Sequence, residues 1–298
     1  MSSVQTSPPA DQRPLLADQR IAIYGLGLMG GSLALALRGR AAQLIGIDPD
    51  PSTRSLAIKN QVVDQVYDFP PGDDPRPTLI ILAATVQTNL HILAQLPEIH
   101  AGPAVILDLG STKRTTLHAM ELLPEYFDPI GGHPMCGKES SGLANATGQL
   151  FDQAVFALCP TLRTSEFASA LASALVAEVG AQPYWLDANE HDLWVASTSH
   201  LPYLVSNVLA ARTPEDAAAL IGSGFISTSR LAASNLEMIM DILLTNRENI
   251  LTVLADYTAR LEQIETLLEL ENIAGLKQAL QQGAEKRKLL ITKKPGNA

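Results

Sequence analysis

Residues 20–48 of the chain read RIAIYGLGLMGGSLALALRGRAAQLIGID. The apolar run Ile21–Tyr24 is followed at once by Gly25-Leu26-Gly27-Leu28-Met29-Gly30 and then by an apolar segment with helical spacing. A strand, a G-x-G-x-x-G turn and a helix in this order are typical of a dinucleotide-binding unit. There Gly25 permits a tight turn, Gly27 lets the backbone approach a pyrophosphate, and Gly30 lets the helix pack on the strand. We therefore predict that these six residues bind a dinucleotide.

The second apolar run of this unit, Leu44–Ile47, ends at Asp48, eighteen residues after Gly30. An acidic side chain at this place typically accepts the hydroxyls of the adenosine ribose. A 2′-phosphate there would meet like charge, at a cost approaching roughly 4 kcal/mol at about 4 Å and intermediate dielectric. We predict NAD as the cofactor. Arg54 is close enough in sequence to clamp a phosphate, which keeps NADP as the alternative, and Asp48 in Asp-Pro-Asp-Pro is also a common turn residue.

Further short apolar runs alternate with helical patterns along the first part of the chain. They are Leu79–Leu82, Val105–Leu107, Phe127–Ile130, Val155–Leu158 and Gln182–Leu186. Runs of this kind, bounded by turn residues, are typical of parallel strands covered by helices on both faces. The sequence therefore predicts an α/β fold in which residues 20–187 form a Rossmann-type, doubly wound sheet.

The chain changes in character after Asp187, where Leu/Ala/Ile-rich stretches with helical spacing replace the strand-like runs. The expected helices are 188–211, 214–221, 236–268 and 273–290, the third either continuous or broken near Asn246. Their apolar faces exceed what one small bundle buries, which predicts an all-α domain of residues 188–298 that forms a homodimer. Residues 1–19 are expected to be a flexible tail.

Composition excludes several classes of function. The 298 residues include 21 Lys plus Arg against 31 Asp plus Glu, a net charge of 21 − 31 = −10, and 46% are apolar. An acidic chain without clustered cations is a poor partner for nucleic acid. Apolar runs reach about six residues, whereas a membrane span needs about 20. With two cysteines and no signal-peptide pattern near residue 1, we expect a cytoplasmic protein that acts on a small molecule.

Two segments of the first half carry candidate catalytic groups. Val105–Leu107 runs into Asp-Leu-Gly-Ser-Thr-Lys, in which Ser111 is placed to cap the next helix and also to face a nicotinamide. The glycine-rich segment 131–142, interpreted as a loop, contains His133. Because it follows a strand-like piece, we expect His133 at the same edge of the sheet as the cofactor and predict that it is catalytic. A Cys136 nucleophile and a metal site are disfavoured by the absence of suitable partners and ligand spacing.

Polar clusters interrupt the otherwise apolar helices of the second half. His191 and His200 each lie in such a cluster, and structural pairing and substrate contact are equally good interpretations for them. Arg230 follows Gly222–Ser229 and is the best candidate for bidentate binding of a substrate carboxylate.

A series of motifs along the chain resembles the prephenate and arogenate dehydrogenases of tyrosine biosynthesis. The motifs are Gly25–Gly30, DLGSTK at 108–113, GHPMCG at 132–137, EHD at 190–192, SHLP at 199–202 and GF…SR at 224–230. The resemblance covers nearly the whole chain from Arg20. It implies a Rossmann domain, a helical dimerisation domain, and oxidative decarboxylation of prephenate to 4-hydroxyphenylpyruvate with hydride transfer to NAD(P).

The resemblance also implies roles for individual residues. His133 would take the proton of the ring hydroxyl, Ser111 would assist at that hydroxyl, and Arg230 would hold a substrate carboxylate. Tyr203 stands where many prephenate-using relatives carry a second histidine, and Ser227 stands where they often carry an aspartate. These departures leave arogenate dehydrogenase, which gives tyrosine directly, as an alternative.

Two other classes remain as alternatives. A β-hydroxyacid or imino-acid oxidoreductase also joins a Rossmann unit to a helical domain, but the hydroxyacid enzymes typically use a lysine in the helical half, and residues 187–276 contain no lysine. A nucleotide-sensing module without turnover would need neither His133 nor Arg230.

Overall fold

The computed structural model describes residues 15–70, 76–138 and 140–293. The chain separates into two compact units, each described here by itself. The first runs to Asp192 and includes Ala233–Thr245, and the second comprises Leu193–Ala232 and the chain from Asn246 onward. These units divide the chain five residues after the predicted domain boundary at residue 187, and they place Ala233–Thr245 in the first unit. The predicted boundary therefore stays a prediction.

The first unit is built on one sheet. Its described strands are β1 (Arg20–Tyr24), β2 (Gln43–Ile47), β3 (Gln65–Tyr67), β4 (Leu79–Leu82), β5 (Ala104–Asp108), β6 (Phe127–Pro134), β7 (Val155–Pro160) and β8 (Gln182–Trp185). Their order is β3-β2-β1-β4-β5-β6-β7-β8. Strands β1 to β6 pair in parallel, so their carboxyl ends lie at one edge, where ligands bind in such sheets.

One predicted feature of the sheet is wrong. The run Val155–Leu158 was expected to be a parallel strand, yet β7 pairs antiparallel with β6, and β8 then pairs parallel with β7. A parallel neighbour requires a crossover connection, usually a helix. The described part of the segment 135–154 contains only a 3₁₀ turn, Leu143–Asn145, as helical structure, so the chain returns beside β6 in the opposite direction.

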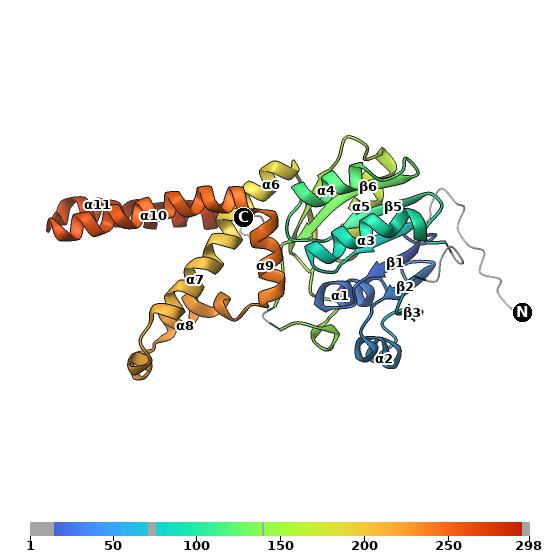
Figure 1. Ribbon diagram of the computed structural model, residues 1–298, viewed down its shortest axis with the longest axis horizontal. Coiled ribbons are helices and arrows are strands. Elements are labelled where there is room, and N and C mark those ends of the chain that lie inside the picture. Colours follow the sequence, from blue (N-terminus) through green and yellow to red (C-terminus); the bar gives the residue numbers. More distant parts are fainter. Residues whose placement is uncertain (1–14, 71–75, 139, 294–298) are drawn as a thin grey trace, which may run out of the picture. The chain divides into compact units, whose positions relative to one another are not determined.

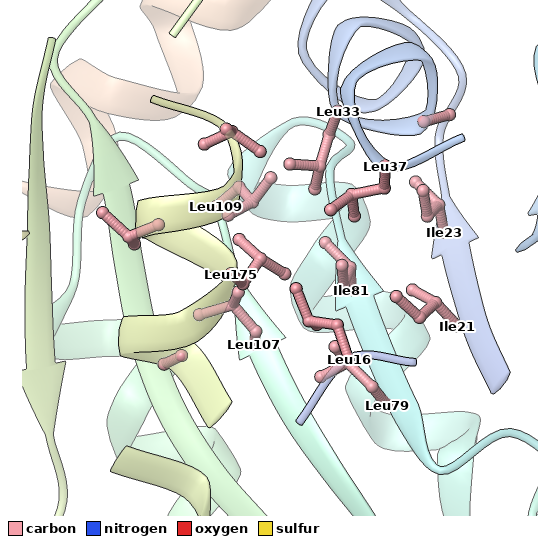
Figure 2. Packing of buried hydrophobic residues seen from close by; sticks show 14 of the residues in the cluster. Leu16, Ile21, Ile23, Leu33, Leu37, Leu79, Ile81, Leu107, Leu109 and Leu175 are labelled. Carbon is pink, nitrogen blue, oxygen red and sulfur yellow. The ribbon is translucent and has the colours of Figure 1, made fainter. Parts of the chain in front are cut away.

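Helices cover both faces of the sheet, as the apolar runs predict. The described α-helices before residue 187 are α1 (Leu28–Leu37), α2 (Pro51–Lys59), α3 (Val86–Ile99), α4 (Arg114–Glu121) and α5 (Glu166–Glu178). Leu33 and Leu37 of α1 and Leu175 of α5 belong to one buried cluster with Ile21 and Ile81 on one face (Figure 2). Residues at alternate positions of the same strands face Leu93 and Leu96 of α3 and Leu117 and Met120 of α4 instead. This alternation is the period of two that a strand imposes.

The folded part of the first unit begins earlier than Arg20. Residues 1–14 of the expected tail lie outside the described residues. Leu16, however, is 2% exposed and packs in the same cluster as Ile21 and Leu79 (Figure 2). Gln19 Nε2 donates to the carbonyl of Leu15 at 3.0 Å and so closes a turn. Leu16 therefore belongs to the core of this unit and not to a tail.

The helix α9 (Leu236–Thr245) completes the first unit. It contacts α3, and its Asp241 carboxylate accepts a hydrogen bond of 3.0 Å from the Gln87 N–H in the first turn of α3. The hydroxyls of Thr245 and Thr112 lie 2.8 Å apart. An acidic side chain at a helix N-terminus stabilises that helix. Helix α9, which follows the last described strand in sequence, therefore caps α3.

The second unit is helical. It begins at Leu193 with the last residues of helix α6 (Ala188–Val195), whose earlier residues belong to the first unit. A π-helical segment, Ala196–His200, and α7 (Leu201–Arg212) follow. The remaining described helices are the short α8 (Ser223–Ser229) and the long α10 (Arg247–Glu269) and α11 (Ile273–Thr292), with 3₁₀ turns at Glu215–Leu220 and Arg230–Ala233. Helices α10 and α11 run side by side (Figure 1), and Arg260 Nη2 donates to Gln282 Oε1 at 2.9 Å. The break near Asn246 is found, whereas α8 was not predicted. Among the described helices, none has both the length and the apolar character that a membrane crossing requires.

Candidate active site

The predicted glycine turn lies at the carboxyl end of β1. Gly25 has a φ of +90°, and its N–H donates to the Ile47 carbonyl at 2.8 Å. A Cβ on Gly30 would lie 1.9 Å from the Gly25 carbonyl oxygen, which is shorter than any real contact. A Cβ on Gly27 would meet no atom within 4 Å. Gly25 and Gly30 are therefore required by the fold of the turn itself, and Gly27 leaves the backbone open to a ligand.

The turn ends in the N-terminus of α1, which suits a phosphate group. Gly27 occupies the N-cap position without a side-chain cap, and α1 begins at Leu28. Leu28 and Met29 form its first turn and are half-buried, whereas the Leu26 side chain is fully buried in the core. Unsatisfied N–H groups and the positive end of the helix dipole favour an anion here. The residues present thus fit the pyrophosphate of a dinucleotide.

Asp48 lies beside this turn, at the end of β2. It is 9% exposed, and its Oδ2 accepts a hydrogen bond of 2.8 Å from the Leu26 N–H. Its Oδ1 accepts from the Asp50 N–H at 3.0 Å. Arg54 Nη1 donates to the carbonyls of Asp48 and Pro49 at 2.9 and 2.8 Å. Asp48 thus anchors the glycine turn, and Arg54 Nη1 binds the main chain of the same loop.

A buried charged pair at the ends of β5 and β6 was not predicted. Lys113 Nζ donates to the Asp108 carboxylate and, at 2.7 Å, to the Gly132 carbonyl. Both side chains are 0% exposed, and Asp108 Oδ1 also accepts from Asn89 Nδ2 at 3.0 Å. The pair therefore ties β5 to the residue that precedes His133. The signal in the sequence was an Asp and a Lys five residues apart directly after a buried strand.

The expected capping role of Ser111 is wrong. Helix α4 begins at Arg114, and Ser111 lies half-buried in the loop before it. The helix is capped instead by Asp192, whose Oδ1 accepts from the Lys113 N–H at 2.7 Å and whose Oδ2 accepts from the Arg114 N–H at 2.9 Å. Because the cap comes from far along the chain, the local sequence gave no sign of it.

His133 lies in strand β6 and not in a loop, which corrects the interpretation of residues 131–134. Gly131 and Gly132 are buried, and a Cβ on Gly132 would lie 2.9 Å from Phe156 Cε1 and 3.0 Å from the Asp108 carbonyl oxygen. Glycine at this place therefore reflects close packing and not a flexible turn. The His133 side chain, half-buried near the carboxyl end of β6, is at the same edge as the glycine turn.

The structure brings His133 and His191 together. His133 Nδ1 lies 2.9 Å from His191 Nε2, and the rings meet edge to face at a centroid distance of 5.1 Å. His191 Nδ1 in turn lies 2.8 Å from Asp192 Oδ1. His191 and Asp192 are 1% and 0% exposed. Of the two interpretations of His191, the structure shows the structural pairing. Asp192, which was not predicted, completes a chain of three hydrogen-bonded side chains.

The remaining predicted residues belong to the second unit. His200, at the end of the π-helical segment, is 3% exposed and lies 3.2 Å from Asn246 Nδ2 through its Nδ1. Tyr203, in the first turn of α7, is 7% exposed. Arg230 begins a 3₁₀ turn and its residue is exposed. The sequence indicated Asn246 only as a possible helix break, and its contact with buried His200 adds a role in fixing that ring.

Cys136 is a poor nucleophile in this structure. Burial raises the pKa of its thiol to about 11, against an ordinary value of 9.0, so at pH 7.5 it has about a hundredfold less thiolate than an ordinary cysteine. We expect iodoacetamide to alkylate it slowly at pH 7.5, and faster as the pH rises towards 11, without parallel loss of activity. Mass spectrometry with Cys136→Ser as the reference identifies the modified sulfur. Rapid alkylation at neutral pH with matching inactivation would contradict this assignment.

A glycine turn and an anion-binding helix terminus lie at the same sheet edge as a half-buried histidine paired with a buried one, an arrangement typical of a dinucleotide-dependent dehydrogenase. Two family models match the chain: "Prephenate dehydrogenase, nucleotide-binding domain" at residues 32–184 and "Prephenate dehydrogenase, dimerization domain" at residues 187–282. The chain belongs to the prephenate dehydrogenase family. The predicted family and α/β fold class are thereby confirmed.

Individual relatives agree with the family models. The chain is 32% identical to prephenate dehydrogenase of Bacillus subtilis over 268 residues, which is 86% of this chain and 72% of that protein. A prephenate dehydrogenase of Aquifex aeolicus, solved with hydroxyphenyl propionate and NAD+, is 27% identical and covers 92% of this chain and 99% of its own, with a TM-score of 0.84. Synechocystis arogenate dehydrogenase is 31% identical and covers 91% and 99%, with a TM-score of 0.77. The prediction of NAD is confirmed at the level of the family.

Proposed function

We propose that this protein oxidises prephenate with loss of carbon dioxide, giving 4-hydroxyphenylpyruvate, and uses NAD as the hydride acceptor. The observation that carries the proposal is the position of His133, paired through Nδ1 with His191 at the carboxyl edge of the sheet that bears the glycine turn. Strands β1 and β6 are three steps apart in the sheet order, roughly 14 Å at the usual strand spacing. The nicotinamide and the substrate ring together would fill that span.

His133 acts as the general base in this reaction. Its imidazole accepts the proton of the ring hydroxyl while hydride leaves the same carbon, because the developing alkoxide expels it. Loss of carbon dioxide then delivers the electron pair of the broken C–C bond to the ring, which becomes aromatic, and the proton returns to the oxygen. A neutral imidazole suits a base near pH 7. Ser111, in the half-buried loop before α4, assists at the same hydroxyl.

Arg230, His200 and Tyr203 are proposed to bind the substrate. Arg230 would hold a carboxylate through its two parallel N–H groups. Tyr203 and Ser227 replace the histidine and aspartate expected in many prephenate-using relatives, so arogenate, oxidised directly to tyrosine, is the second candidate substrate. The likeness to Synechocystis arogenate dehydrogenase supports this alternative.

Asp48 supports NAD over NADP. Its carboxylate accepts backbone hydrogen bonds from Leu26 and Asp50, which fixes a negative charge beside the adenosine end of the glycine turn. Arg54 Nη1 is held by two main-chain carbonyls of the same loop. A 2′-phosphate would therefore meet a fixed carboxylate, and the ribose hydroxyls would meet a hydrogen-bond acceptor.

We also propose a homodimer formed through the helical part of the chain. The second half matches a dimerization domain. In the second unit, large apolar side chains remain exposed on the described faces of α10 and α11, among them Leu261, Leu268, Ile273, Leu280 and Leu289. A second copy of the chain would bury such a surface.

The substrate is tested by following nicotinamide reduction with each pairing of prephenate or arogenate with NAD or NADP. We expect turnover with prephenate and NAD. Faster turnover with arogenate would select the second candidate, and a strong preference for NADP would contradict the role given to Asp48. Absence of turnover in all four pairings, with NAD binding intact, would remove the proposed function.

A further inference from the structure

We propose that His191 and Asp192 are positioning residues that together fix the proton of His133, and that Asp192 also fixes the loop carrying Ser111. This inference rests on the proposed role of His133 as a base. The pair His191-Asp192 thereby has a task that differs from substrate binding.

Asp192 accepts hydrogen bonds from three donors. The Lys113 N–H at 2.7 Å and the Arg114 N–H at 2.9 Å can only donate, and a carboxylate without a proton can only accept. The carboxylate is 0% exposed, yet it faces the N-terminus of α4, where negative charge is stabilised. An ionised Asp192 therefore requires the third contact, His191 Nδ1 at 2.8 Å, to be an N–H donor.

The position of the hydrogen on His191 determines the position of the hydrogen on His133. A neutral imidazole with its hydrogen on Nδ1 has a lone pair on Nε2. His191 Nε2 must then accept the contact of 2.9 Å from His133, so that His133 Nδ1 carries its hydrogen. Neutral His133 consequently has its lone pair on Nε2. When that atom takes the substrate proton, the positive charge on His133 is stabilised by His191, whose ring is polarised by Asp192.

The same carboxylate fixes a second part of the site. The Lys113 and Arg114 N–H groups follow directly after the loop that contains Ser111. The hydroxyl contact of 2.8 Å between Thr112 and Thr245 is another tether of this loop. Without the Asp192 carboxylate, neither the tautomer of His133 nor the position of the loop would be fixed. Without the His191 ring, the loop would still be held and only the tautomer would no longer be fixed.

The kinetic test compares three variants with an exposed control. His191→Leu removes the acceptor, and we expect kcat to fall by about tenfold or more with KM for substrate and NAD nearly unchanged. His191→Gln places a carboxamide oxygen near the former Nε2 and should retain most of kcat. Asp192→Asn should lower kcat roughly a hundredfold, since neither the tautomer of His133 nor the loop that carries Ser111 would remain fixed. His118→Leu, exposed on α4, should behave as the wild type. Equal losses in His191→Leu and His191→Gln would overturn the proposal.

A spectroscopic test needs no substrate and so separates this inference from the proposed function. In the protein labelled with ¹⁵N at the imidazoles of its six histidines, His133 and His191 should both show the Nδ1–H tautomer, assigned by comparison with His133→Asn and His191→Gln. In His191→Leu, the His133 signal should move to a mixture of tautomers. An Nε2–H tautomer of His133 in the wild type, or a signal unchanged in His191→Leu, would refute the positioning role even if turnover is normal.

Discussion

Replacing His133 by asparagine is expected to lower kcat by roughly 10³-fold or more while NAD still binds with wild-type affinity. General base catalysis contributes typically about 10²–10⁴-fold, and asparagine has no basic nitrogen to accept the substrate proton. Its amide can still donate towards His191, so the packing around β6 should persist. The measurement is the steady-state rate of nicotinamide reduction together with NAD affinity by fluorescence quenching.

His118→Asn is the matched control for this substitution. His118 is exposed on α4, so the same chemical change there should leave kcat and NAD affinity unaltered. Retention of more than about a tenth of the wild-type kcat by His133→Asn would exclude His133 as the base. Loss of NAD binding in parallel would instead indicate that the variant has lost its fold.

Replacing Gly30 by alanine should destabilise the first unit by at least about 3 kcal/mol and abolish NAD binding. The new methyl group would lie 1.9 Å from the Gly25 carbonyl oxygen and 3.0 Å from Ala83 Cβ. With backbone on one side and Ala83, directly after β4, on the other, α1 can relax only by moving off β1, and overpacking of this kind costs typically about 1–3 kcal/mol or more. Thermal unfolding and NAD titration measure the two effects.

Gly27→Ala separates the two functions of the turn. A Cβ at this position meets no atom within 4 Å, so the variant should unfold at nearly the wild-type temperature. It should nevertheless bind NAD weakly, because the methyl group occupies the space through which the backbone approaches the pyrophosphate. Equal stability of Gly30→Ala and Gly27→Ala would contradict the packing role of Gly30, and unchanged NAD affinity in Gly27→Ala would place the pyrophosphate elsewhere.

Local pattern was sufficient to predict most of the first unit. The run Ile21–Tyr24, the glycine turn and the helix after it are decided by neighbours in sequence, and the structure forms them where the pattern indicates. The direction of β7 could not be predicted in the same way, because an apolar run has the same composition in either direction. The described part of the connection between β6 and β7 contains a 3₁₀ turn and no crossover helix, which agrees with the antiparallel direction. Leu16 was expected in the tail of residues 1–19, but it is buried by packing against distant strands.

The candidate site was predictable in its residue types but not in its contacts. Asp48 follows strand β2, and His133 comes shortly after the strand-like run Phe127–Ile130, although the structure places it within β6. Their positions after apolar runs indicated both residues. His191, which contacts His133, is 58 residues further along the chain, and Asp192 contacts His191, so no local rule relates these side chains to His133. The cap of α4 was assigned to Ser111 because capping rules are local, whereas the cap is Asp192. Long-range contacts of this kind are set by tertiary packing.

The π-helical segment Ala196–His200 affects where this chain can lose a residue during evolution. The Leu201 N–H bonds to the Ala196 carbonyl, five residues back instead of four, so the segment holds one residue more than regular α-helix would. Deletion of one residue within this segment would restore regular α-helical spacing and leave the rest of α7 facing the same way, because the π turn accommodates the extra residue. Tyr203 and Ser206 would then stay on the buried face, and the Ser206 hydroxyl would keep the Ala232 N–H that it binds. A deletion between Leu201 and Tyr203, in regular α-helix, would instead turn these side chains by about 100° and expose them.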